Sequence, residues 1–176
     1  MPKIIEDLHD RILAQAEKEL FEKGYSNMTM RSVAEGCGIA VGTVYNYYKS
    51  KDVLVAQIML RDWTRIMNTV KFRCESSISI HEAFHEMYNG VIEFVETYES
   101  VWRQYGKDIS VRHEMPMQFD WLIKQLSEIL EEVLIRCHNE EDPYMPVFLA
   151  EILLNTATKK DFKYDNISRL LHRIFP

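Results

Sequence analysis

The stretch from Thr29 to Lys51, TMRSVAEGCGIAVGTVYNYYKSK, constrains the fold of this chain more than any other segment. Thr29 is a good N-cap, because its hydroxyl can accept a hydrogen bond from an unpaired amide of the first helical turn. Apolar residues then recur at helical spacing until two glycines, Gly36 and Gly38, bracket the helix end. A second short helix is predicted from Ala40 to about Tyr48. Two short helices joined by a glycine-containing turn are typical of a helix-turn-helix, whose second helix enters the major groove of DNA.

The segment from Gly42 to Leu54, GTVYNYYKSKDVL, resembles the recognition-helix signature of the TetR family of bacterial transcriptional repressors. Further residues sit where that family places similar ones: Ala14, Phe21, Gly24, Tyr25, Thr29, Val33, Ala34, Gly38 and Ile39. The resemblance covers about a third of the chain, roughly residues 8–60. It implies a homodimeric repressor that binds a palindromic operator, is released by a small-molecule effector and is not an enzyme.

The charge of the chain has to be considered locally. Net charge is −6 and the sequence pI is about 5.5, so the protein is not a uniformly basic nucleic-acid coat. Within the segment 29–51, however, Arg31, Lys49 and Lys51 stand against Glu35 alone, which is three positive charges against one negative. An acidic body with a small basic tip would orient that tip towards phosphate.

The cysteines and the N-terminus indicate the compartment. Three cysteines, widely spaced and without a CxxC pair, argue against a disulfide framework and a structural zinc site, and fit a reducing cytoplasm. No stretch approaches the roughly 18 apolar residues that a membrane span needs. The N-terminus, MPKIIEDLHD, is acidic and is not typical of a signal peptide. We expect a cytoplasmic protein without a cofactor.

The whole chain is predicted to be all-α, because no segment alternates convincingly with period two. About nine helices are expected, in an N-terminal helix-turn-helix domain over residues 1–50 and a helical effector-binding and dimerisation domain over residues 51–176. Outside the two helices of the motif, we expect helices over residues 3–23, 50–73, 79–99, 102–109, 146–159 and 165–174, and one starting near Pro116.

The family resemblance implies roles for individual residues of the motif. DNA-backbone contacts fall to Thr43, Tyr45, Tyr47 and Lys51, and the positions nearest the bases are Arg31, Val41, Gly42 and Asn46. Asn46 is the best candidate for direct readout, because its amide can pair with N6 and N7 of adenine. The alternative for Tyr45 and Tyr47 is packing against neighbouring helices, which is what we expect of Tyr48. The family often has histidine at the position of Tyr47.

A second motif competes with this interpretation. Residues 81–85, HEAFH, match the H-E-x-x-H zinc metalloprotease pattern, and His81 and His85 lie one helical turn apart. However, Tyr88, Val91 and Tyr105 stand where the common sites of this class place their remaining signature residues, and a catalytic zinc needs three protein ligands. A zinc-dependent hydrolase remains an alternative, as does a helical adaptor that binds another protein through its last two helices. Two ordinary surface histidines are the simplest interpretation.

The rest of the chain supplies candidates for sensing and pairing. Aromatic and methionine side chains line adaptable apolar pockets, and the candidates are Trp63, Met67, Met87, Phe94, Tyr98, Trp102, Tyr105 and Trp121. The effector would be small and apolar, or cationic if Glu86, Glu93 and Asp120 face it. The expected dimer interface comprises Phe148, Leu149, Ile152, Leu153, Leu170, Leu171 and Ile174. The alternative for the pocket candidates and for the dimer candidates is that they are ordinary core residues of a single chain.

Overall fold

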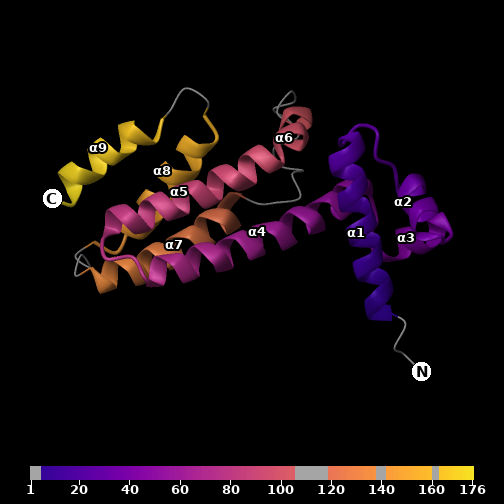
Figure 1. The fold of residues 1–176 in the computed structure, drawn as a ribbon, viewed down its shortest axis with the longest axis horizontal. Helices are drawn as coiled ribbons and strands as arrows, with labels where there is room; N and C mark the ends of the chain where they lie inside the picture. The colour runs from indigo at the N-terminus through magenta and orange to yellow at the C-terminus, as the bar shows by residue number, and fades with distance from the viewer. Residues whose placement is uncertain (1–4, 106–118, 138–141, 160–162) are drawn as a thin grey trace. The chain divides into compact units, whose positions relative to one another are not determined.

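The computed structural model describes residues 5–105, 119–137, 142–159 and 163–176, and within these ranges every regular element is a helix. The described residues contain nine helices: α1 Ile5–Lys23, α2 Met30–Cys37, α3 Val41–Tyr47, α4 Lys51–Glu75, α5 Ile80–Thr97, α6 Glu99–Tyr105, α7 Phe119–Arg136, α8 Met145–Ala157 and α9 Tyr164–Ile174 (Figure 1). The prediction of an all-α fold of about nine helices is confirmed. No helix in the described part of the chain is both long enough and apolar enough to span a membrane.

The described residues form two compact units. The first contains α1 to α3, α4 as far as Asp62, and α6; the second contains α4 from Trp63 onward, α5 and α7 to α9. Because α4 is a single helix of 25 residues, it contributes to both units. The first unit therefore holds the predicted helix-turn-helix together with the beginning of α4.

The start and end of α2 follow from specific backbone bonds. The amide of Ser32 donates to the Thr29 hydroxyl at 3.0 Å, and the amide of Thr29 donates to the Ser32 hydroxyl at 3.1 Å, which forms a capping box. At the other end Gly38 has a φ of +68°, and its amide donates to the carbonyl of Glu35. Gly36, which we expected to help end the helix, instead lies inside α2, where a Cβ would overlap the side chain of Gln15 of α1.

A buried carboxylate joins α1 to this cap. Glu19 is only 3% exposed, and it accepts hydrogen bonds from the Ser32 hydroxyl at 2.5 Å and the Gln15 amide at 3.1 Å. The ammonium of Lys23 lies 3.1 Å away. Burial by itself would raise the pKa of Glu19, but the bonds from Ser32, Gln15 and Lys23 outweigh it, so the pKa is lowered. The negative charge therefore stabilises the packing of α1 against the beginning of α2.

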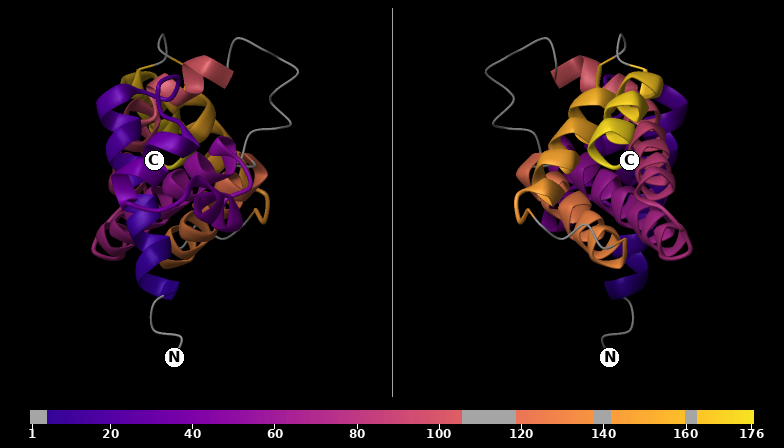
Figure 2. Two further views of the ribbon diagram at one scale, coloured as in Figure 1. Left: turned by 90° about the vertical axis from the view of Figure 1, so that its right-hand side faces the viewer. Right: turned by 90° about the vertical axis from the view of Figure 1, so that its left-hand side faces the viewer.

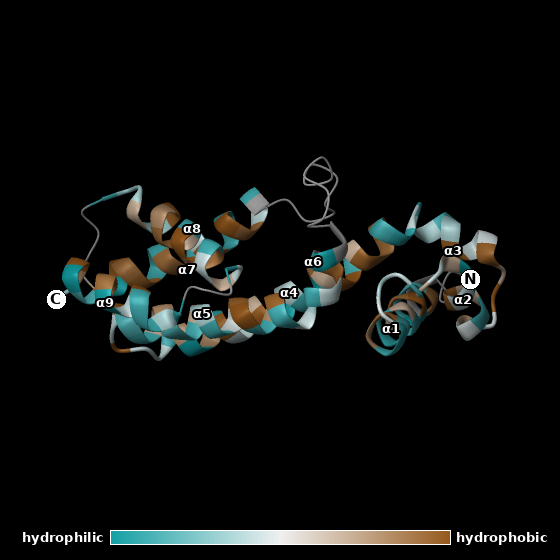
Figure 3. Ribbon diagram, turned by 90° about the horizontal axis from the view of Figure 1, so that it is seen from above, coloured by the Kyte–Doolittle hydropathy of each residue, from teal (hydrophilic) through white to brown (hydrophobic). Residues whose placement is uncertain are grey.

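In the second unit, α8 packs against α7 and α5, and α9 lies beside α5 (Figures 1 and 2). Hydrophobic segments run along α7 and α8 (Figure 3), and their side chains fill the core together with those of α5. Gly90 allows α5 to come close to α4, because a Cβ at this position would lie 2.4 Å from a methyl group of Val70. Arg136 of α7 donates to the carbonyl of Cys74 at 2.6 Å, which links α7 to the end of α4.

The helix α6 begins earlier than predicted, at Glu99 rather than near Trp102. The side chain of Tyr98 is buried at the junction and bonded to Asp62, so α5 ends at Thr97 and the next helix starts directly after this anchor. The remainder of the predicted 102–109 helix lies outside the described residues.

The buried charge of Glu19 gives a stability prediction. The pKa of Glu19 is lowered in the folded protein, so its ionised carboxylate stabilises the fold fully at pH values above the ordinary glutamate pKa of about 4.3. This stabilisation is lost as the pH falls through the lowered pKa of the folded protein. Glu19→Gln should reduce the free energy of unfolding by about 1–3 kcal/mol at neutral pH, and the difference from wild type should shrink below about pH 4. Denaturant unfolding of the full chain across this pH range measures it.

Glu22→Gln is the matched control, because Glu22 is on the same helix but exposed to solvent, with Lys18 4.0 Å away. It should change the unfolding free energy by less than about 1 kcal/mol. If the unfolding free energy lost in Glu19→Gln stayed constant as the pH falls below about 4, the stabilising role assigned to the charge would be contradicted.

Candidate functional site

The helix α3 presents one exposed face. On α3, Val41 is 40% and Tyr45 46% exposed, and Gly42 and Asn46 are exposed beside them. Val44, on the opposite side of α3, is completely buried. The turn Gly38–Ala40 between α2 and α3 is only three residues long, and the amide of Ile39 donates to the carbonyl of Ala34 at 3.0 Å to hold it. The exposed face of α3 is therefore fixed by the burial of Val44 and by a tight turn.

Two of the predicted DNA contacts on α3 are partly buried. Thr43 is half-buried on α3, and the half-buried ring of Tyr47 lies 6.3 Å from the ring of His9 of α1. Tyr47 thus packs against α1 while part of it remains accessible. Tyr48 is buried, as expected, and its ring lies 5.6 Å from that of His9. Burial raises the pKa of Tyr48 to about 12.

The predicted DNA-contacting cations on α2 and at the start of α4 differ in their surroundings. Arg31 lies on α2 with its Nε 3.1 Å from a carboxylate oxygen of Glu35, and both side chains are largely exposed. Lys51, at the start of α4, is half-buried with its Nζ 4.1 Å from the centre of the Tyr25 ring. The Tyr25 hydroxyl donates to Asp52. Burial lowers the pKa of Lys51, and the neighbouring Asp52 acts in the opposite direction.

Tyr98, a predicted effector contact, is buried in the first unit. Its hydroxyl donates to the carboxylate of Asp62 at 2.7 Å, and its ring lies 5.9 Å from that of Phe21. Burial, reinforced by the bond to Asp62 and its charge, raises the pKa of Tyr98. Sequence reasoning overlooked Asp62, although a charged residue one position before Trp63 on an apolar helical stripe was a signal that it is buried with a partner.

The other predicted effector contacts are distributed differently. Trp63, Met67, Met87 and Phe94 are all less than 5% exposed in the core of the second unit, and the Trp63 and Phe94 rings meet edge to face at 5.0 Å. Among the described residues, the buried indole N–H of Trp63 has no acceptor. Trp121 is half-buried on α7. The side chains of Trp102 and Tyr105 lie outside what the structure describes.

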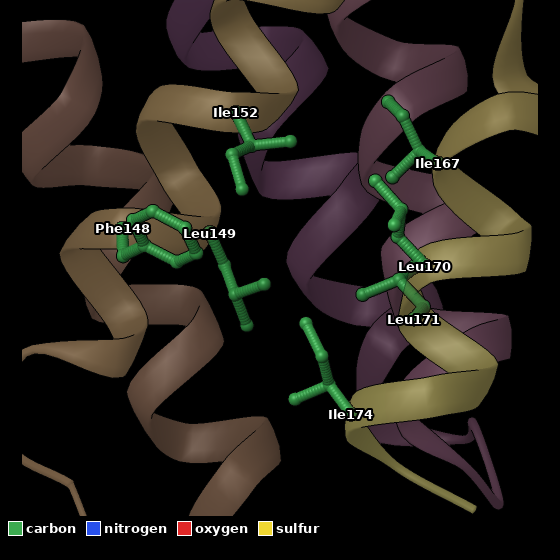
Figure 4. A pocket seen from close by; sticks show the side chains of 7 residues that line it. All are labelled: Phe148, Leu149, Ile152, Ile167, Leu170, Leu171 and Ile174. Atoms are coloured by element: carbon green, nitrogen blue, oxygen red, sulfur yellow. The ribbon is translucent and has the colours of Figure 1, made fainter.

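The predicted dimer residues divide into a buried and an exposed group. Leu149, Leu153 and Leu171 are buried within the chain itself. A groove of about 210 Å³ between α8 and α9 is lined by Phe148, Leu149, Ile152, Ile167, Leu170, Leu171 and Ile174, whose side chains point towards one another from the two helices (Figure 4). At its rim Phe148 is 51%, Leu170 49% and Ile174 43% exposed.

The residues of the H-E-x-x-H motif take part in packing α5. Nε2 of His81 donates to the carbonyl of Phe175 at 2.9 Å, and its ring stacks on that of His172 with 4.0 Å between the centres. The ring of His85 lies 4.6 Å from that of Tyr164. Glu82 accepts from the amide of Ile78 ahead of the first turn. Within the described ranges, no three His, Cys, Asp or Glu side chains come together as metal ligands.

Comparisons with known proteins agree with the geometry of the first unit. Residues 12–58 match the family model described as bacterial regulatory proteins, tetR family. The HTH-type transcriptional regulator UidR of Escherichia coli strain K12 is 32% identical over 85 residues, which are 42% of this chain and 43% of UidR. An uncharacterized HTH-type transcriptional regulator of Haemophilus influenzae is 24% identical over 90 residues, 51% of this chain and 48% of that protein. The matched part thus spans about half the length of these relatives.

Solved structures extend the similarity of fold to nearly the whole chain. A TetR-family transcriptional regulator from Pectobacterium atrosepticum superposes with a TM-score of 0.73 at 15% identity, covering 99% of this chain and 95% of that one. The transcriptional regulator FadR from Bacillus subtilis, solved in complex with stearoyl-CoA, gives a TM-score of 0.59 at 16% identity, covering 94% and 96%. The fold of this chain is therefore similar to that of these two solved structures.

Proposed function

We propose that this chain, a member of the TetR family of bacterial regulatory proteins, is a repressor that binds a palindromic operator as a homodimer and releases it when a small molecule binds. The observation that carries the proposal is the exposed face of α3, where Tyr45 and Asn46 project from a helix whose other side is buried through Val44. A short helix of this kind can enter the major groove, with cations at its edges meeting the phosphates.

The proposed phosphate contact of Lys51 and the proposed base contact of Asn46 are expected to respond differently to mutation. Lys51→Ala should weaken binding to every DNA sequence. It should also reduce the steepness of the plot of log affinity against log salt concentration by about 1 for each helix-turn-helix that contacts DNA. Asn46→Ala should cost about 1–3 kcal/mol on the specific site, because an amide that pairs with adenine discriminates between bases, and little on random DNA. Selection of bound sites from a random duplex pool gives the operator, and fluorescence anisotropy over a salt series measures both variants.

Glu35→Gln serves as a control for general changes at this surface, because Glu35 lies on α2 beside Arg31 and removing a negative charge should not weaken phosphate binding. Equal losses for Asn46→Ala and Lys51→Ala on specific and random DNA would show that the proposed division between base and phosphate contacts is wrong. If the wild-type protein enriched no palindrome, the repressor proposal would fall.

The apolar groove between α8 and α9 supports the dimer. Half-exposed Phe148, Leu170 and Ile174 form a contiguous apolar surface, and such a surface usually marks an interaction site. A second copy of the same two helices offers the same apolar residues, as a two-fold interface requires. Two linked recognition helices would then read the two halves of a palindrome.

Leu170→Glu should separate the dimer, because a carboxylate would be buried in an apolar interface without a partner. Its effect on the stability of the single chain should be small, since Leu170 is about half exposed. Sedimentation equilibrium at micromolar concentration should give one chain for this variant and two for wild type, with palindrome affinity reduced at least tenfold.

Asn166→Glu is the control with the same added charge. Asn166 is exposed on α9 outside the groove and accepts a bond from Arg169 at 2.8 Å, which a glutamate can also accept. It should remain dimeric. A wild-type protein that sediments as one chain would contradict the dimer itself.

The second unit is the proposed effector region. The buried N–H of Trp63, without an acceptor among the described residues, lies in an apolar core with Met67, Met87 and Phe94. An apolar molecule that carries a hydrogen-bond acceptor would satisfy this donor, although it would have to displace α4 from its close contact at Gly90. Binding that favours the displaced helix shifts the population away from the DNA-binding state.

An effector screen tests this region, with stearoyl-CoA as the first probe because the similar FadR was solved with it. A true effector should raise the unfolding midpoint of the wild-type protein and release DNA. Trp63→Phe, which keeps an apolar ring but lacks the N–H, should weaken this effector about 5- to 10-fold. The same response from Trp63→Phe and wild type would contradict the proposed contact, and Phe72→Leu, at an exposed position of α4, is the control.

A further inference from the structure

A short loop after α1 places one aromatic ring beneath the start of α4. Gly24 has a φ of +76°, and its carbonyl accepts from the amides of Asn27 and Met28, both at 3.2 Å. This turn presents the half-buried Tyr25 to α4, where the Lys51 ammonium lies 4.1 Å from the ring centre. The ring is held in turn by the bond from its hydroxyl to Asp52.

A ring in this position affects how Lys51 can meet a phosphate. The negative face of an aromatic ring attracts an ammonium, most strongly where water is partly excluded. A free lysine side chain has many rotamers and loses that freedom when it binds. An ammonium already held over a ring has lost much of it before DNA arrives, and its remaining N–H donors stay available to phosphate oxygens.

We propose that Tyr25 is a positioning residue for DNA binding: its ring holds the Lys51 ammonium in the place where it meets a backbone phosphate. The inference rests on the proposed function, because it assumes that this surface binds DNA. The Tyr25 hydroxyl contributes by keeping Asp52 engaged, so that this neighbouring carboxylate is turned towards the phenol.

Lys49 provides an internal comparison. It is exposed, two residues before Lys51, and within the described part of the chain it has no ring, ion-pair or hydrogen-bond contact. The two lysines therefore differ in the feature that the proposal concerns. Removing the Tyr25 ring should impair the contribution of Lys51 and leave that of Lys49 unchanged.

A double-mutant cycle on the full chain tests the coupling. The dissociation constants of Tyr25→Leu, Lys51→Ala and the combined variant are measured by fluorescence anisotropy, on the selected operator and on a random duplex, over a series of salt concentrations. Tyr25→Leu should weaken binding about 5-fold on both duplexes. In the Lys51→Ala background, Tyr25→Leu should not weaken binding further. In the Lys49→Ala background, Tyr25→Leu should weaken binding by the same factor as in the wild-type protein.

A second series separates positioning from folding. Tyr25→Phe retains the ring and should bind within about 2-fold of wild type. Replacing this phenylalanine with increasingly fluorinated phenylalanines keeps the shape but weakens the negative face, so affinity should fall stepwise while the unfolding midpoint stays constant. This series remains informative even if Tyr25→Leu does not fold.

Two results would overturn the inference while leaving the proposed function intact. One is an additive loss in the Lys51→Ala background, which would mean that Tyr25 acts only on the fold. The other is a loss for Tyr25→Phe as large as that for Tyr25→Leu, which would assign the effect to the hydroxyl. Failure of the proposed function looks different, because the wild-type protein itself would then bind neither duplex, and the inference would fall with it.

Discussion

Glu19 places a negative charge on the buried side of α1, where it meets the hydroxyl of Ser32 at 2.5 Å. The same hydroxyl accepts from the amide of Thr29 and so belongs to the capping box of α2. The N-terminus of a helix carries partial positive charge, which favours a carboxylate there. One buried group thus stabilises the packing of α1 and the first turn of α2, and α2 in turn fixes α3 through the turn at Gly38. The exposed face of α3 depends on this chain of contacts.

Both units contain buried polar groups, and only some of these have a partner among the described residues. In the first unit, some buried or half-buried polar groups are joined in pairs, such as Asp62 with Tyr98 and Tyr25 with Asp52, whereas the buried hydroxyl of Tyr48 has no partner among the described residues. Such bonds fix geometry, because a buried polar group that loses its partner costs more than the bond contributes. In the second unit the core is largely apolar, and the indole N–H of Trp63 has no acceptor in the described part of the chain.

The H-E-x-x-H motif illustrates how a sequence pattern acquires another use in the fold. The helical spacing of His81 and His85 was correctly predicted, but both rings are directed to α9, where they meet His172 and Tyr164. The ligands that would complete a metal site have to come from other helices, and sequence spacing on one helix says nothing about them. In this fold the partners are the imidazole ring of His172 and the phenol ring of Tyr164, both on α9, and the backbone carbonyl of Phe175 directly after it.

Local chemistry determined much of this protein from its sequence. Thr29 as a cap, Gly38 as a helix end, and the 3.6-residue period of apolar side chains were enough to predict an all-α chain, and the segment from Gly42 to Leu54 was specific enough to indicate the family. These signals depend only on residues within a turn or two of each other. Only the tertiary structure showed that Glu19 joins α1 to the α2 cap, that Asp62 is buried against Tyr98, that the Tyr25 ring lies under Lys51, and which residues of α8 and α9 remain exposed. Each of these depends on side chains separated by many residues in the chain, and their meeting is decided by how the helices pack.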